Sequence, residues 1–231
     1  MRHVFHLFIP GGPAAVGELR ALAADDAERV RRVLRLRPGD ALTVADGAGT
    51  VFAARLAGDG VELTAELAPA PAPTPLGVRL ALAGARAETA VEKLVELGVE
   101  RIGPLSSAAA GRAPRLERWV RIARAAAEQS KRPRLPIIDG PVALAAALRP
   151  GALLLSHEEP DGDLDAALAR VTAPVELLVG PEAGFDAAEL AAARAAGVPI
   201  ATLGPLLLRS ETAAIVAAAL ALDRLGELAL R

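Results

Sequence analysis

Prolines alternate with small residues from Ala68 to Pro75, and this segment separates two parts of the chain that have different hydrophobic patterns. Alternating proline removes the amide hydrogens that helices and sheets require and favours the extended polyproline II conformation. We therefore predict a semi-rigid, proline-rich linker at residues 71–76. It would join an N-terminal domain of residues 1–70 to a C-terminal domain of residues 77–231.

The N-terminal part contains short apolar runs that are separated by turn residues. Asp46-Gly47 and Asp59-Gly60 are strong hairpin signals, because glycine supplies the positive φ that such turns require. The predicted strands are Val4–Ile9, Ala41–Ala45, Thr50–Ala57 and Val61–Leu67, with one helix over about Asp25–Leu34. This pattern predicts a small β-barrel with one helix.

After the proline-rich segment, apolar runs alternate with amphipathic stretches. The predicted strands are Val78–Ala83, Arg101–Leu105, Ala152–Ser156, Val175–Val179 and Pro199–Leu203. The predicted helices are Glu88–Leu97, Leu116–Gln129, Val142–Leu148, Asp163–Arg170, Ala187–Ala196 and Glu211–Leu225. Such alternation predicts an α/β domain with a mostly parallel sheet, in which ligands bind at the carboxyl ends of the strands.

Composition excludes several classes of site. The chain has a net charge of −2, which argues against a protein that coats nucleic acid non-specifically but leaves room for a local RNA-binding patch. It has no cysteine, so it has neither disulfides nor thiol nucleophiles. His3 and His6 lack a carboxylate at a matching spacing, so we expect no metal site, and both side chains to face solvent or a domain interface. We also expect no membrane span and a cytoplasmic location.

The first loop of chemical interest follows the strand Val175–Val179. Gly180, Pro181 and Gly184 allow a ligand to approach the backbone closely. Asp186 and Glu189 are spaced as a helix capping box. The loop has neither the Gly-Lys-Ser/Thr ending of a phosphate loop nor a GxGxxG pattern, which disfavours a nucleotide-binding oxidoreductase. Glu182 suits a ligand that carries hydroxyls, an amine or a sulfonium.

A second loop, Leu203–Leu208, leads into the last helix, which Ser210 is expected to cap. Its leucines would either line an apolar slot for a flat base or pack in the core. Arg209 opposes the helix dipole, which indicates that it has a partner or a function. A third loop, Leu155–Glu158, also follows a predicted strand and is weak evidence when taken alone.

Two segments resemble signatures of the SPOUT 16S rRNA uracil-N3 methyltransferases. Val179–Phe185 (VGPEAGF) resembles the GPEGG motif, and Leu203–Ala213 (LGPLLLRSETA) resembles LG-x-R-I-L-R-x-E-T-A. Further matches follow in the family's order. They are Val33–Asp40 with VLRL-x-x-GD, Glu92–Val99 with QK-x-x-ELG, Glu117–Ile122 with ERW-x-KI, and Ala127–Ser130 with Arg132 and Pro136 for A-x-EQ-x-x-R.

The resemblance implies a PUA/OB-like N-terminal RNA-binding barrel and a C-terminal SPOUT α/β domain with a trefoil knot. It implies S-adenosylmethionine as cofactor, a homodimer, and 16S rRNA or the small ribosomal subunit as substrate. The cofactor-binding residues that it implies are Leu155, His157, Glu158, Gly180, Pro181, Glu182, Gly184, Leu203, Gly204, Leu206, Leu208 and Thr212.

The implied reaction, methylation of N3 of a uridine, requires loss of the N3 proton. A cation favours the uracil anion, so we assign this catalytic role to Arg209, with Glu211 orienting it. The expected RNA-binding residues are Arg29, Arg31, Arg32, Arg35, Arg37 and Arg132, with Arg121, Arg124, Lys131 and Arg134 as further candidates. Alternatively, the arginines near residue 30 form a solvated helix face balanced by Asp25, Asp26 and Glu28.

The sequence departs from the family pattern at three positions. Ala183 replaces a glycine, while Leu206 and Ala109 stand where arginine is common. These departures leave two alternatives open. One is a SPOUT RNA methyltransferase with a different target nucleotide. The other is a non-catalytic RNA-binding or ribosome-assembly factor of the same fold.

Overall fold

The computed structural model describes residues 4–67, 72, 75–110 and 114–227, which divide into two compact units. The first unit comprises residues 1–72 and 124–135, and the second comprises residues 73–123 and 136–231. Most of the proline-rich segment lies outside the described residues, so the predicted linker stays a prediction. The first unit takes in residues 124–135, which belong to the predicted C-terminal domain.

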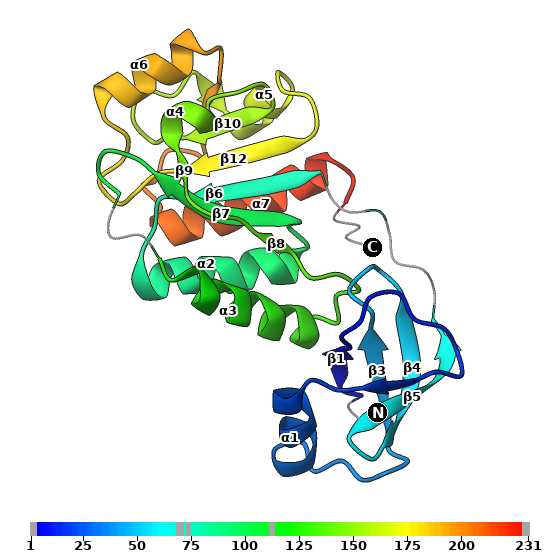
Figure 1. Cartoon of the computed structure of the whole chain (residues 1–231). Coiled ribbons are helices and arrows are strands. Elements are labelled where there is room, and N and C mark those ends of the chain that lie inside the picture. Colours follow the sequence, from blue (N-terminus) through cyan, green and yellow to red (C-terminus); the bar gives the residue numbers. More distant parts are fainter. Residues whose placement is uncertain (1–3, 68–71, 73–74, 111–113, 228–231) are drawn as a thin grey trace. The chain divides into compact units, whose positions relative to one another are not determined.

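The first unit is a curled five-stranded sheet with one helix (Figure 1). Its elements are β1 (His6–Phe8), β2 (Leu19–Ala21), α1 (Ala24–Arg32), β3 (Ala41–Ala45), β4 (Val51–Ala57) and β5 (Gly60–Glu66). The strand order is β1-β3-β4-β5-β2, and β1 pairs with β3 in parallel while the other pairs are antiparallel. Short β2 was not predicted, because its residues Leu19–Ala21 are largely exposed and carry no buried run.

The two hairpins illustrate how the turn residues act. Asp46 Oδ1 accepts hydrogen bonds from the backbone N–H groups of residues 48, 49 and 50, and Gly47 has φ +76°, as the Asp-Gly signal predicts. In the second turn the positive φ, +61°, belongs to Gly58. Gly60 is needed for another reason, because a Cβ there would lie 2.4 Å from the carbonyl oxygen of Arg20 in β2. Alternate residues of β4, such as Phe52, Ala54 and Leu56, fill the core.

The second unit is built on an eight-stranded sheet in which every recorded pairing is parallel. Its strands are β6 (Leu76–Leu80), β7 (Arg101–Ser106), β8 (Ile137–Ile138), β9 (Val142–Ala143), β10 (Ala152–Leu155), β11 (Gly162–Asp163), β12 (Val175–Val179) and β13 (Ile200–Thr202). The order is β11-β13-β10-β12-β6-β7-β8, with β9 beside β7. The two-residue strands β8, β9 and β11 were not predicted, because two residues show no hydrophobic period.

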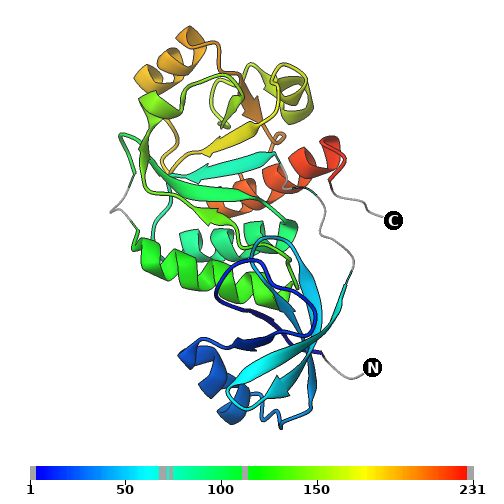
Figure 2. The same ribbon diagram turned by 45° about the vertical axis from the view of Figure 1, so that its right-hand side comes forward.

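The helices are α2 (Gly84–Leu97), α3 (Leu116–Gln129), α4 (Leu144–Ala147), α5 (Leu164–Leu168), α6 (Ala187–Ala195) and α7 (Ser210–Arg224). In both views α2 and α7 lie on one side of the sheet and α4 and α6 on the other (Figure 1 and Figure 2). Strands β6, β10 and β12 are buried along their whole length because both faces are covered, which explains their continuous apolar runs. None of the helices in the described ranges has the length and apolar character to cross a membrane.

Two local predictions have different outcomes. The capping box of α6 is confirmed: Asp186 Oδ1 accepts from the backbone N–H of Glu189 at 2.8 Å, and Glu189 Oε2 accepts from that of Asp186 at 3.0 Å. The predicted Ser210 cap of α7 is wrong, because Arg209 occupies the N-cap position and no side chain caps the helix. Ser210 is already the first helical residue.

Candidate active site

A cavity of about 160 Å³ opens where β10, β12 and β13 end. These strands are neighbours in the sheet although β10 and β12 are separated in sequence by β11 and α5. The three loops at their carboxyl ends therefore meet, as expected for a ligand site in a parallel sheet. These are the three loops that the sequence singled out: Leu155–Glu158, Gly180–Gly184 and Leu203–Leu208.

Ten of the twelve predicted cofactor-binding residues line this cavity. They are Leu155, His157, Glu158, Gly180, Pro181, Glu182, Gly184, Leu203, Leu206 and Leu208. Gly204 and Thr212 do not line it. The lining also includes residues that sequence reasoning missed: Ser156, Val179, Ala183, Ala201, Thr202, Leu207, Ser210 and Ala213. Most of these are direct neighbours of predicted residues, so the pattern found the loops but not every side chain.

Short-range hydrogen bonds hold two of the loops in shape. In the first, Ser156 Oγ donates to the carbonyl of Glu158 at 2.9 Å and accepts from its backbone N–H at 3.1 Å. In the last, Thr202 Oγ1 donates to the carbonyl of Gly204 at 3.1 Å, and Gly204 adopts φ +123°. A β-branched or bulky residue would not adopt this backbone conformation without strain. The loop turns here and carries the leucines back over the cavity.

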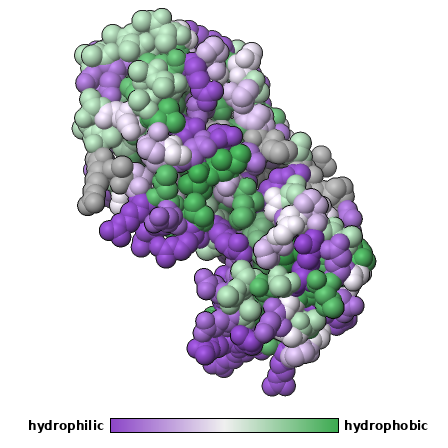
Figure 3. All heavy atoms as spheres, viewed as in Figure 1, coloured by the Kyte–Doolittle hydropathy of each residue, from purple (hydrophilic) through white to green (hydrophobic). Residues whose placement is uncertain are grey.

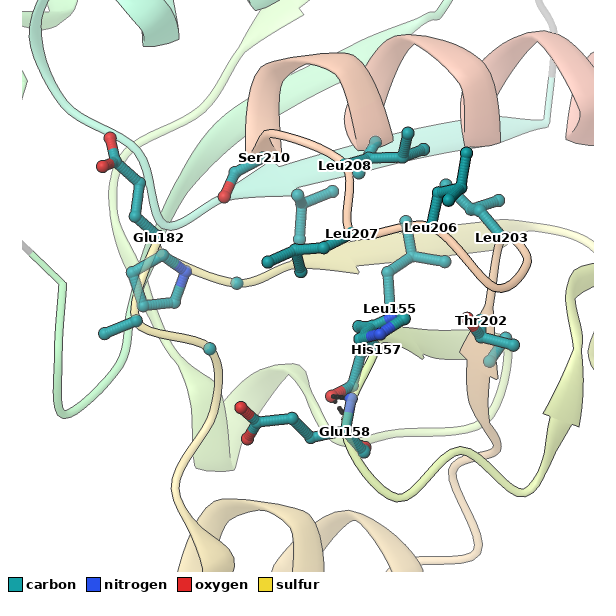
Figure 4. A pocket seen from close by; sticks show the side chains of 18 residues that line it. Leu155, His157, Glu158, Glu182, Thr202, Leu203, Leu206, Leu207, Leu208 and Ser210 are labelled. Carbon is teal, nitrogen blue, oxygen red and sulfur yellow. Dashed lines mark hydrogen bonds between the residues drawn. The ribbon is translucent and has the colours of Figure 1, made fainter.

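The leucines of the last loop are not core residues. Leu206 and Leu207 are 75% and 79% exposed, and both line the cavity. In Figure 4 the side chain of Leu207 reaches from the loop before α7 toward the middle of the cavity. Exposed leucines of this size are costly to leave in water. The alternative that this run packs in the core is therefore wrong for Leu206 and Leu207.

The rim of the cavity carries acidic groups. Glu158 and Glu182 both line it, and in Figure 4 Glu182 lies at the upper left and Glu158 below it. Glu182 forms an ion pair with Arg86, in the first turn of α2. Arg86 Nε also lies 3.9 Å from Glu211 Oε1. Sequence reasoning missed Arg86, since a lone arginine on an amphipathic helix carries no signal of its own.

The predicted catalytic pair is not in contact. Glu211 faces Arg86, and its Oε2 is buried without a hydrogen-bond partner in the described part of the chain. Arg209 is exposed and has no ion-pair partner within the described ranges. Its neighbours Leu208 and Ser210 line the cavity, whereas Arg209 itself does not. The structure thus gives Glu211 a different partner from the one that we predicted.

The predicted RNA-binding arginines have three kinds of surroundings. Three are paired with acids: Arg29 with Glu128 at 2.6 Å, Arg32 with Glu28 at 2.8 Å, and Arg31 with Asp59. Arg35 and Arg37 are exposed and form no ion pair with other described residues. Arg132 is half-buried, and its carbonyl accepts a hydrogen bond from His6 at 3.0 Å. Figure 3 shows hydrophilic side chains gathered over α1.

His6 was expected to face either solvent or a domain interface. It is 5% exposed and bonds to Thr43 Oγ1 at 2.9 Å, so the first of these two expectations is wrong. Burial lowers the pKa of His6 below its ordinary value, although the hydrogen bond to Arg132 opposes this shift. His3 lies outside the described residues. In the described ranges, no cluster of histidine and acidic side chains is suited to hold a metal.

Comparison with known proteins identifies the family. Residues 71–222 match the RNA methyltransferase domain family. The chain is 31% identical over 222 residues to ribosomal RNA small subunit methyltransferase E of Mycobacterium tuberculosis, covering 87% of this chain and 85% of the relative. For the enzyme of the same name from Synechocystis the identity is 34% over 206 residues, covering 82% and 68%.

Comparison with solved structures gives the same family. Ribosomal RNA small subunit methyltransferase E from Neisseria gonorrhoeae, bound to S-adenosyl methionine, superposes with a TM-score of 0.84 at 28% identity, covering 96% of this chain and 98% of that one. A Legionella pneumophila protein in complex with the same cofactor gives a TM-score of 0.83 at 27% identity, with the same coverage. The chain belongs to the RNA methyltransferase family that includes ribosomal RNA small subunit methyltransferase E.

Proposed function

We propose that this enzyme transfers the methyl group of S-adenosylmethionine to N3 of a uridine in 16S rRNA. One observation carries the proposal: three loops far apart in sequence converge on one cavity at the carboxyl ends of β10, β12 and β13. The Neisseria relative, which shares the fold over nearly its whole length, holds S-adenosyl methionine. The small-subunit RNA substrate follows from the names of the relatives.

The residues of the cavity fit this cofactor. The leucines of the last loop, with Leu155, give an apolar slot of the kind that takes a flat adenine. Glu158 supplies a negative charge that complements a sulfonium or ammonium group. Gly180 leaves no room for a side chain, since a Cβ there would lie 2.8 Å from the ring of Phe185. Glycine at this position therefore allows the buried ring of Phe185 to pack against the loop that lines the cavity.

The cofactor supplies an activated methyl group, and the chain must position the uridine and remove its N3 proton. Arg209 is the residue that we propose for the second task. Its guanidinium is exposed and unpaired within the described ranges, beside the cavity residues Leu208 and Ser210. A cation near uracil favours the N3 anion, because it stabilises the negative charge. Glu211 would act on Arg86 and the Glu182 loop rather than on Arg209.

We also propose the finer architecture that the resemblance implies. The curled sheet would close as a PUA/OB-like barrel, and the cavity loops would form the trefoil knot of a SPOUT domain. The chain would act as a cytoplasmic homodimer. The dimer rests on the resemblance, and Leu220, 49% exposed on α7, is a position at which it can be tested. Leu220→Glu is expected to yield a monomer in light scattering, whereas the wild-type chain should give a dimer.

The first test is calorimetric titration with S-adenosylmethionine, with NADH as the control ligand. Saturable binding of S-adenosylmethionine alone is expected. Transfer of labelled methyl to unmodified small subunits, followed by mapping of the modified nucleotide, then tests the reaction. Modification of another nucleotide would replace the uridine N3 proposal with a different target. RNA binding without cofactor binding, even with rRNA present, would favour a non-catalytic RNA-binding factor.

A further inference from the structure

A second cavity, of about 240 Å³, lies within the first unit and plays no part in the site described above. Its walls come from the start of the chain, α1 and the end of α3. The lining residues are Val4, Phe5, His6, Leu7, Arg29, Leu34, Ala125, Glu128, Gln129 and Lys131.

We propose that this cavity binds a nucleobase of the RNA substrate, next to a backbone phosphate held by Lys131. The inference rests on the proposed function, because it takes the substrate to be RNA. It names a site away from the reacting uridine, in the unit that lacks the candidate active site. Proteins that recognise RNA by sequence bind splayed-out bases in pockets of this type, with apolar walls and a few polar groups.

The charged wall of the cavity is balanced, which suits an uncharged base. Glu128 is buried and pairs with Arg29 at 2.6 Å and with Arg124 Nε at 3.3 Å. Asp26, also buried, pairs with Arg124 at 2.6 Å and lies 3.8 Å from Arg29. Two arginines thus neutralise two carboxylates. A free anion would find no excess positive charge at this wall, whereas a neutral ring would meet no unpaired charge.

Polar groups that a base edge can use remain available. Arg29 Nε is buried and has no hydrogen-bond partner among the described residues. Buried donors are normally paired, so this N–H is suited to donate to a base carbonyl. The exposed side-chain amide of Gln129 forms no hydrogen bond within the described ranges. An amide offers a donor and an acceptor together, which matches the edges of bases.

One aromatic side chain, that of Phe5, lines the same cavity. Phe8, Phe52, Phe185 and Trp119 are at most 3% exposed. The chain has four phenylalanines and one tryptophan. The remaining one, Phe5, is half-buried and lines the cavity. Aromatic rings are the usual surfaces against which single-stranded bases stack.

Backbone conformation marks the rim. Lys131, which lines the cavity, has φ +57°, and Arg35, which follows the lining residue Leu34, has φ +53°. The positive φ of Lys131 closes the C-terminal end of α3, where the backbone N–H of Arg132 donates to the carbonyl of Ala127 at 2.8 Å. Both residues are exposed cations without an ion-pair partner in the described part of the chain. Lys131, which lines the cavity, is therefore available to hold a phosphate next to a bound base, and Arg35 is adjacent in sequence to a lining residue.

The decisive variant is Ala125→Phe, which fills the cavity from an exposed helical position without changing charge. It is expected to raise the dissociation constant for a small-subunit rRNA transcript, measured by fluorescence anisotropy, and the KM for small subunits, each at least tenfold. The kcat and the affinity for S-adenosylmethionine should not change. Ala24→Leu, an exposed position on α1 outside the cavity, is the matched control and should leave RNA affinity unchanged.

Salt dependence separates the base contact from the phosphate contact. Lys131→Ala should lower the slope of log affinity against log salt by about one phosphate, roughly 0.7 for single-stranded RNA. Gln129→Ala should weaken binding several-fold and leave that slope unchanged. Because both side chains are exposed, these variants should fold. They therefore test the inference even if Ala125→Phe fails to fold.

Nucleoside 5′-monophosphates provide a probe without a full RNA. They should compete with the transcript at millimolar concentration, whereas ribose 5-phosphate should not. Equal competition by both, or unchanged RNA binding by Ala125→Phe and Gln129→Ala, would overturn the inference while leaving the methyltransferase proposal intact. Cavity-dependent RNA binding by a chain that neither binds S-adenosylmethionine nor transfers methyl would support the inference and overturn the proposed function.

Discussion

Phe185 packs against Gly180 so closely that a Cβ on the glycine would lie 2.8 Å from Cε2 of the ring. Phe185 is buried in the core formed with α4 and α6, so it cannot move aside easily. Gly180→Ala should therefore displace the loop that follows β12 and reduce the affinity for S-adenosylmethionine at least tenfold, which corresponds to about 1.4 kcal/mol.

The double variant Gly180→Ala/Phe185→Leu should recover part of that affinity, because a smaller side chain makes room for the new methyl group. Gly140→Ala is the control, since a Cβ there would meet nothing within 4 Å. Calorimetric titration of the three variants checks this. Full affinity in Gly180→Ala would show that the loop tolerates the methyl group.

Arg209→Ala should reduce kcat by about 10²-fold or more if the guanidinium stabilises the developing uracil anion. Binding of S-adenosylmethionine should remain, since Arg209 does not line the cavity. Single-turnover transfer of labelled methyl, measured across pH, separates an effect on the chemical step from an effect on cofactor binding. Loss of the cation should shift activity toward higher pH, where more of the uracil is ionised. Unchanged turnover would remove Arg209 from the mechanism.

Arg79 and Glu176 form a buried ion pair, Nε to Oε1 at 2.7 Å, between neighbouring strands β6 and β12. Removing one partner of an isolated buried pair costs about 3–5 kcal/mol, because the other charge stays buried. Arg79→Met should show a smaller loss in urea unfolding, since Arg149 also bonds to Glu176 at 2.7 Å and keeps that carboxylate paired. Arg79→Met/Glu176→Met should be the more stable of the two variants, and a still less stable double variant would contradict this explanation.

His6 should make stability depend on pH. Because its pKa is lowered in the folded state, the unfolded chain binds the proton more tightly. The stability that neutral His6 contributes is present above its ordinary pKa of 6.5 and is lost as pH falls from there toward the folded value. His6→Gln should flatten this part of the profile, measured by thermal unfolding between about pH 7.5 and 5. An equally steep profile in the variant would assign the effect to other groups.

The α6 capping box should be worth about 1 kcal/mol. Asp186→Ala removes the bond to the backbone N–H of Glu189 and should lower the free energy of unfolding by this amount. Asp186→Asn keeps an oxygen acceptor and should be close to wild type. Glu189 also accepts from the backbone N–H of Ala108 at 2.7 Å, so Glu189→Ala should expose the loop after β7 to faster hydrogen exchange.

Local signals in the sequence were sufficient for much of the fold. Helix α3 and strands β3 and β12 were predicted with the bounds that the structure shows, because each has a complete hydrophobic period or a continuous apolar run. The Asp46-Gly47 turn and the Asp186–Glu189 capping box were also predictable, since each depends on residues at most three or four positions apart.

Long-range pairing was not predictable in the same way. The sequence carries no sign that β12 lies between β6 and β10, or that Glu211 faces Arg86 rather than Arg209. The second cavity joins the start of the chain to residues 125–131, more than a hundred positions away. No local sequence pattern predicts that these two distant segments line one cavity.

The sequence alone determined which loops matter, because strand ends followed by Gly, Pro and acidic residues are a local property. It also determined the family through motifs in a fixed order. Only the tertiary structure decided that Leu206 and Leu207 are exposed over the cavity, and that His6 is buried. Burial depends on what packs against a residue from elsewhere in the chain, and that is set by the fold as a whole.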